Sequence, residues 1–150
     1  MLQKDKSKYP FTEEDVNNII RMDKYIDGTF LQDDPPNSFE DTVYVGSDRE
    51  DIGLVFSIRP ERRTIGVALK LRNERIRGIN NVTHHRPDCK ILKGWHEHIW
   101  KIPYRDKWAE SLIPRKELST PKGIVKFALK RWNIKTFGVF GEQLELRGNK

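Results

Sequence analysis

The chain has 150 residues, of which 36% are hydrophobic and 33% are charged, and its formal net charge is +6. This length is typical of one compact domain, and the sequence contains no apolar run long enough for a membrane span. The amino-terminal segment lacks the apolar core of a secretory signal. Cys89 is the single cysteine, which excludes an internal disulfide and a multi-cysteine zinc site. We therefore expect a cytoplasmic protein that does not bind membranes.

The charge is divided unevenly along the chain. Residues 1–48 carry 5 basic and 11 acidic residues, a sum of −6, whereas residues 49–150 carry 23 basic and 11 acidic residues, a sum of +12. The basic part predicts an affinity for RNA or another nucleic acid. The acidic part predicts a protein partner. The alternative is that both sets of charges only solvate the surface.

The first predicted element is a helix from Thr12 to Asp27. Thr12 and the three carboxylates after it suit a helix amino terminus, apolar residues recur at helical spacing, and Gly28 suits the carboxyl-terminal cap. We expect residues 1–10 to form a mobile polar tail before this helix. The acidic segment 31–41, which contains a Pro-Pro pair, predicts a loop after it.

The middle of the chain has the composition of β-strands. Apolar residues alternate over 52–59 and again over 65–71, and the short turn between these runs predicts an antiparallel hairpin. Further runs with strand character cover residues 42–45, about 75–83 and about 95–103.

The last predicted element is a helix that begins at Thr120-Pro121, a capping hydroxyl followed by a proline at the first helical position. The order helix, strands, helix predicts an α+β fold. We expect an antiparallel meander of four to five strands with an amino-terminal and a carboxyl-terminal helix packed on it. The single domain spans residues 11–137, and residues 138–150 form a strand or a tail.

All four histidines lie within 15 residues, at His84, His85, His96 and His98. Strand alternation places the side chains of His96 and His98 on the same face. If the preceding strand pairs antiparallel with theirs, the connecting loop brings His84 back to them. Three imidazoles would then meet at one spot.

Such a cluster inside a basic protein predicts catalysis of RNA cleavage. His84, His96 and His98 would supply the general acid and base. The substrate would be held by the nearby residues Arg86, Lys101, Arg105 and, through base stacking, Trp100. This mechanism requires no metal and no cofactor.

Three other interpretations remain open. His84, His96, His98 and Asp88 could bind a metal as in three-nitrogen zinc enzymes, although the surrounding cations oppose a divalent ion. Cys89 could act as a nucleophile beside a histidine. The chain could instead be a non-catalytic module, such as an inhibitor, an antitoxin-like protein or a nucleic-acid binder, with structural histidines.

The order of its motifs resembles an uncharacterised family of small bacterial domains that are often associated with prophages. These motifs are FTEEDVNNIIRMDKYI, THHRPD, WHEHIW and DKWAESLI, and the likeness covers about residues 11–137. His84, Pro87-Asp88, His96, His98 and Trp108-Ala109 match the family pattern. The chain is more loosely similar to TumE-type toxins of toxin–antitoxin modules, a resemblance that implies a ribonuclease of mobile-element or defence type.

Overall fold

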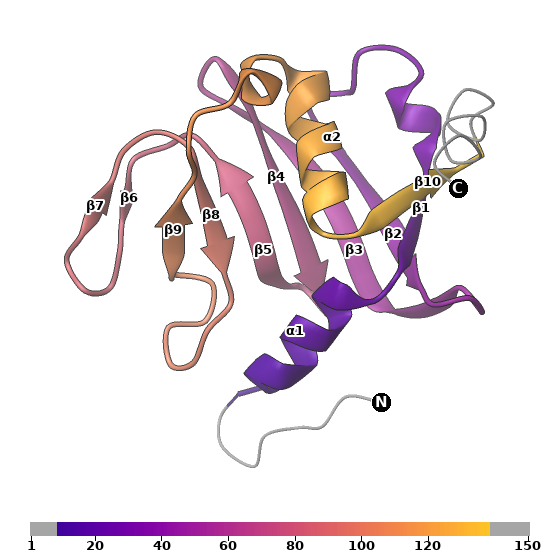
Figure 1. The fold of residues 1–150 in the computed structure, drawn as a ribbon, viewed down its shortest axis with the longest axis horizontal. Helices are drawn as coiled ribbons and strands as arrows, with labels where there is room; N and C mark the ends of the chain where they lie inside the picture. Colours follow the sequence, from indigo (N-terminus) through magenta and orange to yellow (C-terminus); the bar gives the residue numbers. More distant parts are fainter. Residues whose placement is uncertain (1–8, 139–150) are drawn as a thin grey trace.

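The computed structural model describes residues 9–138 and confirms the α+β class (Figure 1). The predicted tail and carboxyl-terminal extension therefore lie almost entirely outside the described residues. The elements, in chain order, are α1 (Glu13–Arg21), β1 (Lys24–Asp27), the 3-10 helix η1 (Gly28–Leu31), β2 (Phe39–Val45), β3 (Glu50–Glu61), β4 (Thr64–Leu71), β5 (Glu74–Asn80), β6 (His84–His85), β7 (Ile91–Leu92), β8 (His96–Ile99), β9 (Ala109–Ser111), the 3-10 helix η2 (Lys116–Ser119), α2 (Pro121–Arg131) and β10 (Ile134–Phe137).

The main sheet has eight strands, more than the four to five that the sequence predicts. Its order is β10-β1-β2-β3-β4-β5-β8-β9, with β6 and β7 forming a separate two-stranded ribbon. Neighbouring strands are antiparallel except β1 and β10, which are parallel. The predicted meander is therefore present, and three short strands, β1, β9 and β10, extend it at its two edges.

The amino-terminal helix is shorter than predicted, because α1 ends at Arg21 and the next residues form β1. Lys24 explains the early end. Its Nζ donates to the carbonyl oxygens of Ile19, Ile20 and Met22 at 2.6, 2.7 and 2.8 Å, so a buried side chain caps the helix where a glycine is more usual. The predicted cap at Gly28 is therefore wrong.

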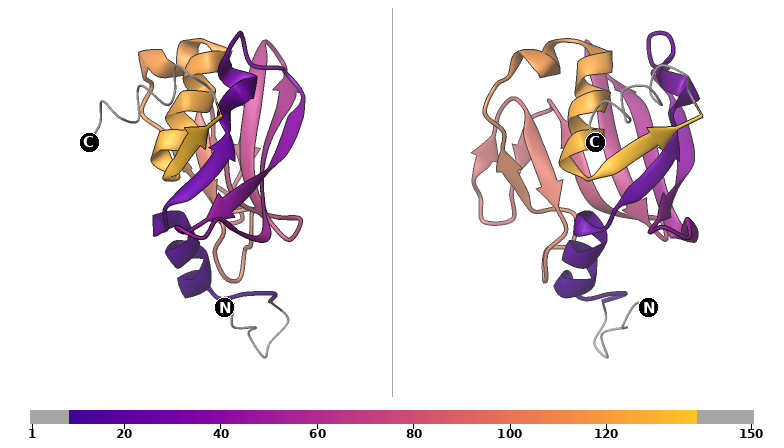
Figure 2. Two further views of the ribbon diagram at one scale, coloured as in Figure 1. Left: turned by 90° about the vertical axis from the view of Figure 1, so that its right-hand side faces the viewer. Right: turned by 45° about the vertical axis from the view of Figure 1, so that its right-hand side comes forward.

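Helix α2 covers one face of the sheet and leaves the other face open (Figures 1 and 2). Its buried residues pack over the inward-facing rows of β3 and β4, of which Phe56 and Leu69 are fully buried. Helix α1 instead lies beyond the end of the sheet, so the expectation that both helices pack on one face is only half correct. The alternation along each strand thus separates a helix-covered face from an open face.

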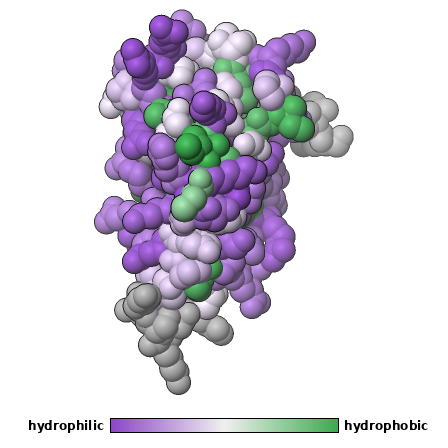
Figure 3. All heavy atoms as spheres, turned by 90° about the vertical axis from the view of Figure 1, so that its left-hand side faces the viewer, coloured by the Kyte–Doolittle hydropathy of each residue, from purple (hydrophilic) through white to green (hydrophobic). Residues whose placement is uncertain are grey.

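The described surface is mostly polar. Figure 3 shows the side that carries β6, β7 and β9 as largely hydrophilic, with separate apolar patches. The exposed large apolar residues are Val82, Ile91 and Ile113. Neither described helix has the length and apolar composition that a membrane span requires.

Candidate metal centre

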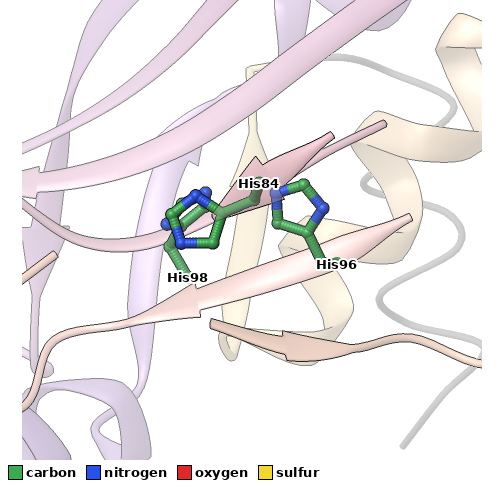
Figure 4. A group of neighbouring side chains, drawn as sticks. All are labelled: His84, His96 and His98. Atoms are coloured by element: carbon green, nitrogen blue, oxygen red, sulfur yellow. The ribbon is translucent and has the colours of Figure 1, made fainter. Parts of the chain in front are cut away.

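Three of the four histidines meet on the open face of the sheet, at strand β8 near its β9 edge (Figure 4). The ring centroids of His84 and His98 are 4.7 Å apart, those of His96 and His98 are 5.0 Å apart, and those of His84 and His96 are 5.5 Å apart. His96 and His98 are 1% and 4% exposed. The fourth histidine, His85, is exposed and does not belong to this His84–His96–His98 triad.

Strand register explains how the triad forms. His96 pairs with Asn80 and His98 pairs with Gly78, so both imidazoles point away from α2. Glu97 lies between them and points to the opposite face, where its carboxylate accepts hydrogen bonds from Arg131, the last residue of α2, and from Trp132, which caps that helix. The β6–β7 ribbon then places His84 against the two rings.

Each imidazole of the triad has one nitrogen fixed by a backbone carbonyl. Nδ1 of His96 lies 3.0 Å from the oxygen of Gly94, and Nδ1 of His98 lies 2.9 Å from the oxygen of Asp106. Nε2 of His84 lies 2.7 Å from the oxygen of Lys107. A carbonyl can only accept, so each of these nitrogens carries the hydrogen. The remaining nitrogens are His84 Nδ1, His96 Nε2 and His98 Nε2, and each has a lone pair.

The surroundings favour uncharged imidazoles. Burial lowers the pKa of His98 to about 3, and the nearby Arg75 charge adds to this effect. Burial also lowers the pKa of His96. Both rings are therefore neutral at physiological pH, which is the state in which histidine binds a metal.

The spacing of the triad approaches that of a metal site. One ligand nitrogen from each ring lies within 4.8 Å of the others. A point within about 2.8 Å of all three nitrogens therefore exists. Rotation of the rings would have to shorten the distance from this point to each nitrogen to the 2.0–2.1 Å of a zinc–imidazole bond.

Asp88, the predicted fourth ligand, does not belong to this group. Its carboxylate lies at the exposed end of the β6–β7 ribbon and pairs with Arg86 at 2.7 Å. Within residues 9–138, the group with metal-ligand spacing holds the three histidines and no carboxylate or thiolate. Three protein ligands leave one tetrahedral position for water.

Two of the three cations that the sequence suggested as phosphate ligands, Arg86 and Arg105, have carboxylate partners. Arg86 pairs with Asp88 and Glu110 and lies 4.1 Å from the ring centre of Trp108. Lys101 lies over the same ring. Arg105 pairs with Glu74. These ion pairs offset much of the positive charge that would oppose a divalent ion.

Trp100, the predicted stacking residue, lies in the core. It is 2% exposed, packs against Phe11 and Tyr9, and donates its Nε1 hydrogen to Glu74. It therefore offers no exposed ring face for stacking on a base, and its place in the predicted substrate site is wrong.

The cation that touches the triad is Arg75, to which the sequence gave no specific role. Its Nη2 lies 3.2 Å from His98 Nδ1, and 3.4 Å from both the backbone oxygen and a carboxylate oxygen of Asp106. The approach to Nδ1 is not a hydrogen bond, because that nitrogen already donates to Asp106 and both groups are donors. Arg75 therefore lies next to the histidine triad but pairs with Asp106.

Comparison of the chain with protein-family models, curated proteins and solved structures gave no match. The geometry of the histidine triad is therefore the main basis for a functional hypothesis.

Proposed function

We propose that this chain is a metal-dependent hydrolase in which His84, His96 and His98 hold one divalent ion of the zinc class. Three imidazoles suit zinc and the neighbouring transition metals. The fourth position would hold a water molecule. A bound ion would lower the pKa of that water, and the chemistry it would supply is a hydroxide for ester or amide hydrolysis, with the water proton passing to the leaving group.

The observation that carries this proposal is the arrangement of hydrogens on the triad. Each ring donates one N–H to a backbone carbonyl, which leaves the other nitrogen of each ring for a metal, and one ligand nitrogen from each ring lies within 4.8 Å of the others. Metal-binding histidines characteristically use their other nitrogen in this way, because the second hydrogen bond fixes the ring and its tautomer.

The same arrangement gives less support to RNA cleavage by histidines alone. That mechanism needs one protonated imidazole as the general acid at neutral pH. Burial lowers the pKa of His96 and His98, and their Nδ1 hydrogens are engaged by carbonyls. RNA stays a predicted substrate, and the non-catalytic alternative also stays untested.

Metal binding can be tested with a control that the chain itself provides. Purified protein is dialysed against zinc, and the bound metal is measured by atomic emission. We expect about one zinc per chain for the wild type and for His85→Ala, because His85 lies outside the triad. We expect little bound zinc for His84→Ala, His96→Ala and His98→Ala. Equal zinc content in all variants would contradict the proposed site.

Activity is tested on a chromogenic ester and on single-stranded RNA, with and without a chelator. The proposal predicts hydrolysis that the chelator removes and added zinc restores. RNA cleavage that survives the chelator but is lost in His96→Ala would instead favour the metal-free mechanism.

A further inference from the structure

A groove lies beside the triad on the open face of the sheet. It has a volume of about 760 Å³, within the range of small-molecule sites. Ser57 and Ala68 line it, and their small side chains leave the surface of β3 and β4 hollow, while the carboxylate of Glu61 lies over Gly66. The strand register places small residues in one row across the sheet, since Ser57 pairs with Ala68 and Ala68 pairs with Gly78. Gly78 in turn pairs with His98. The groove therefore leads across the sheet toward a metal ligand.

Arg75 lies where the groove and the triad meet. Its side chain crosses the surface of Gly78, where a Cβ atom would approach Arg75 Cδ to 2.9 Å. Arg75 and Asp106 both line the groove, and Arg75 Nη2 is also next to His98. The Nε of Arg75 is buried without a hydrogen-bond partner, so the pairing with Asp106 leaves part of the guanidinium unused.

The charges around the groove suit a small ligand better than a polyanion. Arg59, Lys70 and Arg75 each face a carboxylate at 3.4 to 3.6 Å, from Glu61, Glu40 and Asp106, respectively. This compensation lowers the net positive charge at the groove, which weakens its attraction for the phosphates of nucleic acid. Pairs of this length are weak, so the guanidinium of Arg75 can turn to an incoming oxyanion.

Uncharged polar groups complete the lining. Ser38, Ser57, Asn73 and Asn80 contribute hydroxyl and amide groups to the groove. Such groups exchange hydrogen bonds with hydroxyls, since each can both donate and accept.

We propose that this groove binds a small hydroxyl-rich oxyanion, such as a sugar phosphate or a sugar acid, with its anionic group on Arg75. Binding in the groove does not require the metal. The inference therefore rests on the proposed function only where the bound ligand would be hydrolysed at the metal. The ligand would lie along the row from Ser57 to Ala68 and place its anionic end on Arg75, next to the triad.

The test measures calorimetric binding of glucose 6-phosphate, glucuronate and uncharged glucose to the zinc-treated full-length protein. We expect one or both anions to bind and glucose to bind far more weakly, and the preferred anion identifies the group that Arg75 recognises. Arg75→Gln should weaken binding by about tenfold or more, because it removes hydrogen bonds from a charged donor. Arg62→Gln, an equal loss of charge at an exposed turn outside the groove lining, should leave it unchanged.

A second variant tests the groove without altering a charge. Ala68→Leu places a larger side chain on the groove floor and should abolish binding, while the zinc content of the same sample stays at the wild-type level. Equal anion affinity in the wild type and Arg75→Gln, or no anion binding to the wild type, would overturn the inference. Binding of a short single-stranded RNA, with no binding of the small probes, would also overturn it.

The zinc content of each sample separates the two proposals. Anion binding that depends on Arg75 in a protein without zinc would support the groove and contradict the metal site. About one zinc per chain without anion binding would support the metal site and contradict the groove.

Discussion

Glu97 connects strand β8, which carries His96 and His98, to helix α2, and replacing it with glutamine should destabilise the fold. Its side chain is 5% exposed, and its two oxygens accept from Arg131 Nε at 2.9 Å and from Trp132 Nε1 at 2.8 Å. Glutamine keeps the shape but has one oxygen, so its amide group faces one of the two donors. Either the buried Trp132 Nε1 or the partly buried Arg131 Nε then loses its acceptor, at a cost of about 1–3 kcal/mol.

The nearby buried guanidinium of Arg77 adds to this cost, because it interacts with the charge of Glu97. Together these losses predict that Glu97→Gln lowers the free energy of unfolding by about 3 kcal/mol. The assay is urea denaturation followed by tryptophan fluorescence, in which this loss moves the midpoint down by about 1.5 M for a slope of about 2 kcal/mol per molar urea.

Glu110 provides a matched control for this prediction. It also accepts from an arginine and a tryptophan, Arg86 and Trp108, but its side chain is 54% exposed. Water can replace the lost acceptor there, so Glu110→Gln should cost less than about 1 kcal/mol. Equal and small effects of the two substitutions would refute the reasoning that burial makes the Glu97 contacts strong.

Three further predictions concern stability. Lys24→Met should lower the free energy of unfolding by about 3 kcal/mol, because three carbonyls lose a buried donor; the substitution Lys126→Met at an exposed position should cost less than about 0.5 kcal/mol, and equal costs in urea denaturation would contradict the capping role. Thr120→Ala removes the cap on Gly123 N–H and should cost about 1 kcal/mol by the same assay; an unchanged midpoint would show that the cap contributes nothing. Burial lowers the pKa of His98 to about 3 from its ordinary value of 6.5, so between these values the unfolded chain binds more protons than the metal-free folded protein. The stability of the metal-free protein should therefore fall as the pH decreases through this window, by up to about 1.4 kcal/mol per pH unit from His98; His98→Asn should flatten the slope, and an identical slope in both proteins would contradict the assignment.

The meeting of three imidazoles could be foreseen from local rules. Two-residue spacing on a strand fixes a shared face for His96 and His98, and one hairpin is enough to return His84 to them. The tautomers of the three rings could not be foreseen, because the backbone carbonyls of Gly94, Asp106 and Lys107 fix them. Asp106 and Lys107 lie in the β8–β9 connection, whose path depends on the fold.

The position of Arg75 could not be predicted, because the alternation of side chains along β5 is interrupted. Regular alternation would put Arg75 and Arg77 on the same face, but a register shift in the β4–β5 pairing sets Arg75 opposite Lys70 and Arg77 opposite Leu69. The two arginines therefore point to different faces, and Arg75 reaches the triad. A bulge of this kind inserts one residue, and no residue pattern in this segment signals it.

The edge strands were missed for a different reason. Strand β1 follows a helix that a lysine side chain caps, and β10 pairs with it from more than a hundred residues away, with Lys24 opposite Ile134. Such pairing depends on tertiary contacts rather than on local periodicity.

X-ray absorption at the zinc edge of the zinc-loaded protein tests the metal centre most directly. The triad predicts a four-coordinate ion with three imidazole nitrogens at about 2.0–2.1 Å and one oxygen from water. Loss of the imidazole signal in His96→Ala, but not in His85→Ala, would assign those nitrogens to the triad. A six-coordinate shell of oxygens, unchanged by the triad substitutions, would contradict the proposed centre.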